Sequence, residues 1–286
     1  MNSISRHVVA ISGATGYAGS RLATEYARDG FDLVLIGRNI EKLETLGNQL
    51  EQDFKIITKV CLVTDIHEIS ERLDTDLASI KNRICCFINA IGTQDPVGSL
   101  LNNQSESWIS SIEINLTFPA MLSKYFANVL IQNGSGSIIL FSGGGASQGR
   151  ENFSAYASAK TGLVRFVETF SQELRSTKIR INAIAPGVMP SRMMEEILNL
   201  RESAGENETK KAQSSLSNIK SEDSRFIDLC KFLTSDASTK ITGKLISAEW
   251  DNWREWPKHL EELESSDLYT LRRITSRDRG LSWGDL

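Results

Sequence analysis

A glycine-rich turn joins an apolar run to a helix-patterned segment close to the start of the chain. The run extends from His7 to Ser12, and apolar residues recur at helical spacing between Leu22 and Ala27. A strand, a tight glycine turn and a helix in this order direct backbone N–H groups and the helix N-terminus at one point, where a pyrophosphate can bind. The residues expected to form this dinucleotide-binding turn are Gly13, Thr15, Gly16, Tyr17, Ala18 and Gly19. A glycine turn that binds no ligand is the alternative.

Apolar runs and helical patterns alternate along the rest of the chain. Further strands are expected at residues 31–36, 55–63, 84–91, 137–142, 179–185 and 244–248, and further helices at 41–54, 65–77, 105–132, 155–176 and 226–233. Such alternation produces a parallel sheet with helices on both faces. The sequence therefore predicts an α/β fold with a single Rossmann-like, doubly wound parallel sheet.

Two segments depart from this alternation. Residues 191–222 are polar and helix-prone, which indicates a lid or substrate loop and not a second domain. We expect residues 1–250 to form the dinucleotide-binding and catalytic domain and residues 251–286 to form a C-terminal tail. The aromatic and basic residues in and beside this tail include Trp250, Trp253, Trp256, Trp283, Arg272, Arg273, Arg277 and Arg279. The tail is expected to pack on the domain or on a neighbouring subunit, and the alternative is a tail that covers the substrate and binds an anionic group.

Composition argues against several other classes of protein. The formal net charge of −4 is unlike that of a nucleic-acid binder. The four cysteines lie in apolar surroundings and, with three scattered histidines, form no metal-ligand pattern. They indicate reduced core thiols in a cytoplasmic protein. We recognise neither a signal peptide nor an apolar run of membrane-spanning length, so no membrane partner is expected.

The end of the second expected strand bears on the choice of cofactor. In a dinucleotide-binding sheet this position contacts the adenosine ribose, where a carboxylate binds a 2′-hydroxyl and an arginine suits a 2′-phosphate. The strand is followed by Gly37, Arg38 and Asn39, without a carboxylate. Arg38 therefore favours NADP(H) over NAD(H), the alternative being an exposed arginine at a strand end.

Tyr156 stands four residues before Lys160, at the start of an apolar helical pattern. Residues at this spacing share one helix face, and an ammonium group beside a phenol lowers the pKa of the phenol. A tyrosine with a lowered pKa can exchange a proton with an alcohol or ketone near neutral pH. The structural alternative is a buried tyrosine beside a lysine that reaches to solvent.

Taken together, these motifs resemble those of the short-chain dehydrogenase/reductase family over about residues 7–250. The family's glycine turn and its Tyr-x-x-x-Lys pair are matched by the residues described above. Its Asn-Ala-x-Gly motif is matched at Asn89 to Gly92, and its helix asparagine by Asn115. Its Asn-x-x-x-Pro-Gly motif is matched by Asn182, Pro186 and Gly187.

The resemblance implies a role for each of these residues. Tyr156 would be the general acid/base, Lys160 would lower its pKa and hold the nicotinamide ribose, and Asn115 would hold a water between Lys160 and solvent. A serine after the fifth strand would hydrogen-bond the substrate oxygen. The backbone after Pro186 would bind the nicotinamide amide. The implied cofactor-binding set therefore also includes Asn89, Ala90, Gly92, Gly187 and Val188.

Three features depart from the family pattern. The Gly-x-x-Gly-x-x-Gly spacing is closer to the family's extended branch, which includes sugar-nucleotide epimerases and dehydratases. Leu62 replaces an aspartate that usually contacts adenine, and Gly143 stands where the catalytic serine is usual. Ser142 is the expected donor if a bulge turns it toward the substrate, with Ser147 or no serine as alternatives.

We therefore expect an oxidoreductase that transfers a hydride between NADP(H) and the carbonyl or alcohol of a small soluble substrate. A sensor that binds NADP without turnover and an enzyme that modifies a sugar nucleotide are the alternatives. The resemblance implies a homodimer or homotetramer. Residues 93–104, 146–154 and 188–222 are expected to determine the substrate.

Overall fold

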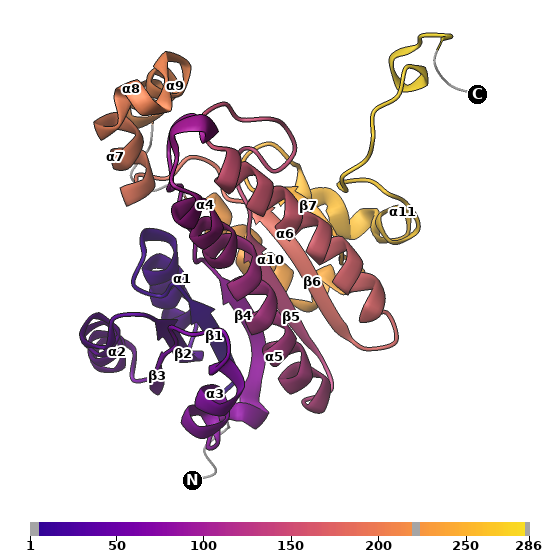
Figure 1. Cartoon of the computed structure of the whole chain (residues 1–286). Helices are drawn as coiled ribbons and strands as arrows, with labels where there is room; N and C mark the ends of the chain where they lie inside the picture. The colour runs from indigo at the N-terminus through magenta and orange to yellow at the C-terminus, as the bar shows by residue number, and fades with distance from the viewer. Residues whose placement is uncertain (1–5, 219–223, 284–286) are drawn as a thin grey trace.

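A computed structural model describes residues 6–218 and 224–283 of the chain. Seven parallel strands form one sheet in the order β3-β2-β1-β4-β5-β6-β7 (Figure 1). The strands are β1 (Val8–Ser12), β2 (Asp32–Gly37), β3 (Thr58–Leu62), β4 (Ile84–Asn89), β5 (Gly136–Phe141), β6 (Ile179–Ala185) and β7 (Leu245–Ser247). The predicted Rossmann-like parallel sheet is confirmed. The chain order reverses between β1 and β4, which is where ligands bind in sheets of this type.

Helices cover both faces of the sheet. One face packs against α1 (Tyr17–Arg28), α2 (Ile40–Phe54) and α10 (Arg225–Thr234), and the other against α3 (Ile69–Leu77), α5 (Phe118–Gln132) and α6 (Ser154–Glu173). Alternate residues of a strand enter the two cores, with Val9 on one side and Val8 on the other. Because both faces are buried, the strands are continuous apolar runs in the sequence. Short 3₁₀ turns form η1 (Lys81–Arg83), η2 (Leu100–Asn102) and η4 (Asp236–Ser238).

Two element boundaries differ from the expectation in ways that have a local cause. The third strand begins at Thr58 and not at residue 55, because Lys55 has a φ of 57° and ends α2 in the left-handed conformation. The helix expected at residues 105–132 is divided into α4 (Ser105–Ile112) and α5 by a π-helical turn, η3 (Glu113–Thr117). Asn115 lies in that turn and donates from Nδ2 to the Ser111 carbonyl at 2.9 Å. A side-chain amide that takes a backbone acceptor one turn back disturbs regular helix geometry.

The polar segment after β6 forms three helices above the carboxyl ends of the strands. These are α7 (Arg192–Asn199), α8 (Arg201–Ala204) and α9 (Glu206–Asn218), drawn in orange in Figure 1. Their apolar undersides pack with Phe153 and Tyr156 in a cluster separate from the two main cores. Residues 219–222 of the expected lid lie outside the described part of the chain. We call α7–α9 the helical lid.

The C-terminal segment returns to the body of the protein before it extends away. It contains η5 (Trp253–Lys258), α11 (Leu260–Ser265) and η6 (Arg277–Arg279). Trp253 and Trp256 are buried in the same core as α10. The C-terminal end of the chain, drawn in yellow, extends away from the body of the protein in Figure 1. The side chain of Trp283 is exposed. The division of the chain at residue 250 stays a prediction.

The open edge of the sheet at β7 is covered by this segment. The buried ammonium of Lys244 donates to the carbonyls of Ser266 at 2.9 Å and Leu268 at 3.0 Å. The Leu245 N–H donates to the Tyr269 carbonyl at 2.8 Å. Edge strands offer unpaired N–H groups to other chains, and this contact removes one of them. No helix in the described ranges is long and apolar enough to cross a membrane.

Candidate active site

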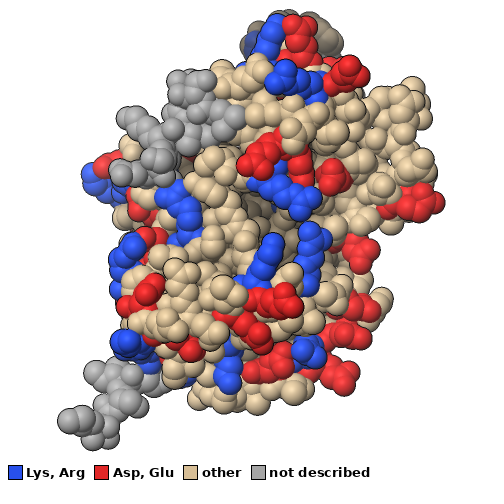
Figure 2. All heavy atoms as spheres, turned by 90° about the vertical axis from the view of Figure 1, so that its left-hand side faces the viewer, with Lys and Arg blue, Asp and Glu red and all other residues tan. Residues whose placement is uncertain are grey.

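The carboxyl ends of the strands open into a cleft of about 2630 Å³ between the sheet and the helical lid. Basic side chains that line it include Arg38, Lys42 and Arg225. Figure 2 shows lysine and arginine side chains around this hollow. In a doubly wound sheet the residues that follow β1, β2, β4, β5 and β6 all meet at this edge. The motifs predicted from the sequence therefore converge on one cleft.

The glycine turn between β1 and α1 is shaped by close backbone contacts. Gly13 has a φ of 70°, and a Cβ atom on it would lie 2.9 Å from the Ala90 carbonyl carbon. A Cβ atom on Gly19 would lie 2.2 Å from the Gly13 carbonyl oxygen. The turn residues that line the cleft are Gly13, Thr15, Gly16, Tyr17 and Ala18. Gly19 does not line it, and its role is to let α1 pack against the turn.

Arg38 lies where the chain leaves β2. It lines the cleft with Asn39 and Lys42, and Asn39 caps α2 by accepting from the Lys42 N–H at 2.9 Å. After β3, Val63 and Thr64 line the same cleft. Arg38 therefore lies at the position expected for a group that contacts the adenosine ribose.

Of the residues after β4, Ala90 and Gly92 line the cleft and Asn89 lies beneath it. The Asn89 side chain is fully buried, and its Oδ1 accepts from the Ser12 hydroxyl at 2.7 Å. This bond joins the ends of β1 and β4 at the switch point of the sheet. Asn89 therefore contacts the sheet and does not line the cleft.

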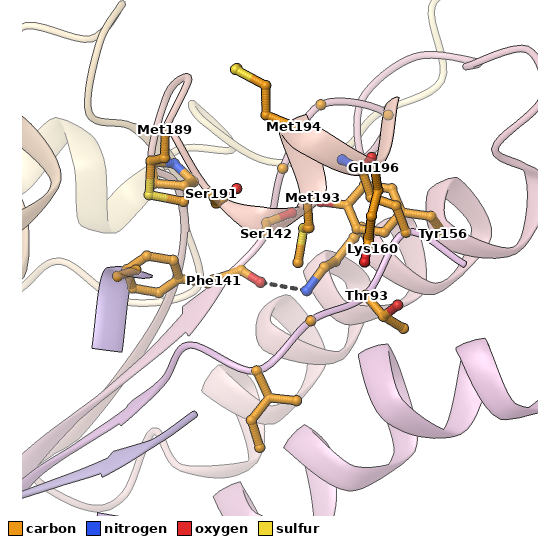
Figure 3. A pocket seen from close by; sticks show the side chains of 18 of the residues that line it. Thr93, Phe141, Ser142, Tyr156, Lys160, Met189, Ser191, Met193, Met194 and Glu196 are labelled. Carbon is orange, nitrogen blue, oxygen red and sulfur yellow. Dashed lines mark hydrogen bonds between the residues drawn. The ribbon is translucent and has the colours of Figure 1, made fainter. Parts of the chain in front are cut away.

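Tyr156 and the end of β5 meet at the floor of the cleft. A Cβ atom on Gly143 would lie 2.3 Å from the Tyr156 hydroxyl oxygen, so only glycine leaves room for that hydroxyl. Ser142 is buried and lines the cleft (Figure 3). Its hydroxyl has no hydrogen-bond partner among the described residues. Ser147, the other candidate donor, also lines the cleft.

Lys160 is buried one turn along α6 from Tyr156. Its ammonium donates to the Phe141 carbonyl at 2.8 Å (Figure 3). Burial lowers the pKa of Lys160 to about 7. The ammonium nitrogen lies 5.8 Å from the centre of the Tyr156 ring.

The sequence predicts that Lys160 lowers the pKa of Tyr156, and the structure does not agree with that prediction. Burial raises the pKa of Tyr156 above its usual value, and the opposing effect comes from the charge of Arg150. Burial also disfavours the charge of Lys160 itself. In the absence of other groups, Tyr156 is therefore a protonated hydroxyl at neutral pH.

Asn115 acts on the loop after β4. Its Nδ2 donates to the Thr93 carbonyl at 2.9 Å, and its Oδ1 accepts from the Thr93 N–H at 3.1 Å. A Cβ atom on Gly92 would lie 3.3 Å from Asn115 Oδ1 and 3.5 Å from the Lys160 nitrogen. Asn115 does not itself line the cleft, but its amide and the Lys160 ammonium lie on the same side of Gly92.

The loop after β6 and the helical lid complete the cleft. Pro186, Gly187 and Val188 line it. The sequence predicts that the backbone of this loop binds the nicotinamide amide, and that role stays a prediction. Met193 reaches in from α7, and its methyl group would lie 3.1 Å from a Cβ atom on Gly92. Among the described residues no group of three or more His, Cys, Asp or Glu side chains is placed to hold a metal ion.

Sequence reasoning missed Arg150, Ser191 and Glu208, all of which line the cleft. Arg150 lies in a segment expected to determine the substrate, but no signal connected it with a carboxylate 58 residues away. Ser191 directly precedes α7, and a serine at the start of a helix is a recognisable signal.

The fold and the cleft define a protein of the nicotinamide-dependent oxidoreductase class, with a glycine turn, a Tyr–Lys pair and an amide that organises the floor. Residues 7–201 match the family model described as "short chain dehydrogenase". The chain therefore belongs to the short-chain dehydrogenase/reductase family, as its motifs predicted.

Relatives with described activities are moderately similar. The chain is 28% identical over 197 residues to 3-oxoacyl-acyl-carrier-protein reductase of Rickettsia bellii, covering 69% of this chain and 78% of that protein. It is 27% identical over 190 residues to the human 3-oxoacyl-acyl-carrier-protein reductase, covering 66% and 78% of the two chains. Actinorhodin polyketide ketoreductase with NADPH has the same fold, with a TM-score of 0.75, 21% identity, and coverage of 86% of this chain and 97% of that one.

Proposed function

We propose that this protein transfers a hydride between NADP(H) and the carbonyl or alcohol of a small soluble substrate. The observation that carries the proposal is the pair of hydroxyl groups on the cleft floor. The Tyr156 hydroxyl fills the space that a side chain on Gly143 would occupy, and Ser142, the preceding residue, has a buried hydroxyl without a partner in the described part of the chain. A buried polar group without a partner is costly, and a substrate oxygen would satisfy it.

The residues of the cleft fit a nicotinamide dinucleotide. Gly13 and Gly16 line the cleft where α1 begins, so a pyrophosphate would bind at the N-terminus of that helix, and Arg38 would pair with a 2′-phosphate. Lys160 would hold ribose hydroxyls, and the backbone at Gly187 and Val188 would hold the amide. The remaining proposed contacts come from Thr15, Tyr17, Ala18, Ala90, Gly92 and Pro186. Gly19 and Asn89, which the sequence also predicts to bind the cofactor, do not line the cleft and would support the site only through α1 and the sheet. When bound, the nicotinamide supplies or accepts the hydride.

The chain's own residues would handle the proton. Tyr156 would donate its hydroxyl proton to the carbonyl oxygen as negative charge develops there, and Ser142 would donate a hydrogen bond to the same oxygen. Lys160, with a pKa of about 7, would stabilise the resulting phenolate. Asn115 would fix the Thr93 backbone and hold a water near Lys160.

The relatives favour carbonyl reduction with NADPH. Two curated relatives are 3-oxoacyl-acyl-carrier-protein reductases, and one structural neighbour was solved with NADPH. A dinucleotide sensor without turnover is the second candidate, because Gly143 stands where a catalytic serine is usual. A homodimer or homotetramer in the cytoplasm stays a prediction.

The first test is a titration of the purified protein with NADPH and, separately, NADH, followed by tryptophan fluorescence. We expect tight binding of NADPH and a preference of at least tenfold over NADH. Arg38→Asp should remove that preference, since repulsion replaces a charge-assisted contact. Equal losses for both cofactors would argue against the role of Arg38, and binding of neither cofactor would overturn the proposal.

The second test separates enzyme from sensor. A panel of ketones and 3-oxoacyl thioesters is supplied with NADPH, and Tyr156→Phe is the matched variant. The enzyme should lose turnover by about a thousandfold or more while it keeps NADPH binding, because only the transferable proton is removed. Tight NADPH binding without turnover of any substrate by the wild-type protein would favour the sensor.

A further inference from the structure

A partly buried ion pair joins the helical lid to the loop that precedes α6, the helix of Tyr156. Arg150 precedes α6, and its Nε and Nη2 atoms lie 2.9 Å and 2.8 Å from one carboxylate oxygen of Glu208 on α9. The two side chains are only 15% and 16% exposed. The second Glu208 oxygen accepts from Lys211 at 3.1 Å. When an arginine and a carboxylate are partly removed from water, losing one of them leaves the other charge without compensation.

The same guanidinium lies over two aromatic rings on the other side. Its carbon is 3.8 Å from the centre of the fully buried Phe153 ring and 5.8 Å from the centre of the Tyr156 ring. Cations are attracted to aromatic faces at these distances. Arg150 therefore stands between the lid and the tyrosine that the proposed function makes the proton donor.

Further contacts show that the lid is docked directly on this tyrosine. Tyr156 and Phe153 pack with Ile197 of α7, Ala204 of α8 and Ala212 of α9. Asn152 also donates to the carbonyl of Ala204 at 3.3 Å. The three lid helices thus close over Tyr156 through one apolar cluster, with the Arg150–Glu208 pair at its edge.

The charged groups that face Tyr156 come from four elements. Lys160 lies on its own helix, Arg150 on the preceding loop and Glu208 on α9. Glu196 of α7 projects toward the same place in Figure 3 and is paired with Arg192 at 2.7 Å. Glu151 lines the cleft and is exposed. Glu208 is the carboxylate that directly opposes the charge of Arg150.

We propose that Arg150 is a positioning residue that holds the helical lid closed through Glu208 and whose charge stabilises the phenolate form of Tyr156. This inference rests on the proposed function, because the proposed function is what makes Tyr156 a proton donor. With the lid docked, Glu208 offsets the guanidinium charge and Tyr156 keeps its proton for the carbonyl. When the lid opens, the charge is no longer offset and the phenolate is favoured. Lid closure and proton donation are therefore coupled.

Directions of the pKa shifts agree with this geometry. Burial raises the pKa of Tyr156 and the Arg150 charge lowers it. Burial alone would raise the pKa of Glu208, but its bonds to Arg150 and Lys211 hold that pKa below its usual value. Glu208 therefore remains a carboxylate when the lid is docked.

Two substitutions separate the electrostatic role from a merely structural one. Arg150→Met removes the cation, whereas Glu208→Gln keeps it and removes its counter-charge. Both should make residues 192–218 more open to limited proteolysis, because both break the pair. Because both variants open the lid, the loss of burial is common to them, and the Tyr156 pKa should be higher in Arg150→Met than in Glu208→Gln by about half a unit or more.

The Tyr156 pKa is read from phenolate absorbance in the ultraviolet, with the same variant carrying Tyr156→Phe subtracted to remove the other four of the five tyrosines. Equal Tyr156 pKa values in the two variants, or a higher value in Glu208→Gln, would overturn the electrostatic role. Unchanged proteolysis in both variants would overturn the role in lid closure. Lys210→Gln is the matched control, since it breaks the exposed Lys210–Glu206 pair on the outer side of α9 and should change neither readout.

A double variant guards against misfolding caused by an unpaired charge. Arg150→Met with Glu208→Gln removes both charges, and it should show an open lid and a Tyr156 pKa close to that of Arg150→Met. The charge exchange Arg150→Glu with Glu208→Arg should restore protection from the protease and raise the Tyr156 pKa above that of the wild-type protein. Restored protection with a lowered pKa would contradict the proposal. None of these readouts needs turnover, so failure of the wild-type protein to reduce any carbonyl would count against the proposed function alone.

Discussion

Gly143 and Tyr156 fit together at the scale of single atoms. The space that a side chain at residue 143 would occupy is filled by the Tyr156 hydroxyl. Ser142, one position earlier in the chain, has a buried hydroxyl with no hydrogen-bond partner among the described residues. The glycine is therefore what permits the tyrosine to sit against the end of β5.

Gly143→Ala should lower kcat by at least tenfold, because the added methyl group would overlap the Tyr156 hydroxyl, 2.3 Å away, and push it from its place. NADPH binding should change little, since the glycine turn is not touched. Gly144→Ala is the control, as a Cβ atom there meets nothing within 4 Å. Full activity in Gly143→Ala would show that Tyr156 does not act from this position.

Lys160→Met should change how stability depends on pH. Burial lowers the pKa of Lys160 to about 7 in the folded protein, and the unfolded chain keeps it near about 10.4. Between these values the unfolded state binds more protons, so wild-type stability rises with pH by about 1.4 kcal/mol per unit from this group. Below about pH 7 the full cost of burying the charge applies.

The free energy of unfolding, measured with urea at pH 7 and pH 9, should therefore rise by ~2 kcal/mol more in the wild-type protein than in Lys160→Met. Other titrating groups are the same in both proteins and cancel in this comparison. A difference between the two proteins that does not vary with pH would show that Lys160 is solvated.

Residues with a motif could be found from the sequence, and residues without one could not. The spacing of Tyr156 and Lys160 and the arginine after the second strand were sufficient to place them at one cleft. The pKa of Tyr156 was predicted in the wrong direction, because burial is a property of the packed structure. Arg150 and Glu208 meet only because the lid folds back over α6.

At the scale of elements, the site depends on how strands end and helices begin. The Asn89–Ser12 bond holds the ends of β1 and β4 together, and α1 packs closely on the turn between them. The π-helical turn at Asn115 brings an amide to the Thr93 backbone. These contacts fix the floor of the cleft before any ligand binds.

Gly19→Ala should weaken NADPH binding by at least tenfold, because its methyl group would lie 2.2 Å from the Gly13 carbonyl oxygen and force α1 away from the turn. Overpacking of this kind typically costs 1–3 kcal/mol of stability, roughly. Gly47→Ala on α2 is the matched control, since its Cβ atom would lie 2.8 Å from the Thr58 hydroxyl on β3, and Gly47 does not line the cleft. It should lower the melting temperature without changing NADPH affinity, and equal effects of the two variants on binding would contradict the role of Gly19.

Elements were predictable where burial on both faces makes a strand continuously apolar, as in β1 and β4. The π-helical turn was not, because the apolar stripe of residues 105–132 continues through it with helical spacing. The start of β3 was displaced by the left-handed conformation of Lys55, a choice that lysine seldom makes.

Over the whole molecule, the chain after residue 250 divides into a packed part and an extended part. Trp253 and Trp256 lie in the core, and the Trp256 ring is 4.4 Å from the Tyr269 ring. Beyond residue 272 the apolar side chains Ile274, Leu281 and Trp283 are exposed. The sequence could not predict which of these tryptophans are buried and which are exposed, because their burial depends on the path of the chain.

Trp256→Ala should destabilise the protein by about 3 kcal/mol or more, as expected when a buried tryptophan is truncated. Removal of residues 273–286 should leave the melting temperature unchanged within about 2 °C, since this part contributes no buried side chain among its described residues. Thermal unfolding monitored by circular dichroism measures both. A large loss of stability in the truncated protein would show that the extended part packs on a second copy.

The contact between Leu245 and Tyr269 has a consequence for how the chain is made. Because synthesis proceeds from the N-terminus, β7 is an unpaired edge strand until the residues that cover it have left the ribosome. A chain released or cut before Ser266 would carry that border permanently, and such borders recruit strands from other molecules into aggregates. The residues around Tyr269 thus complete the sheet last, and proteases that remove incomplete chains should cut first where this contact with β7 is lost.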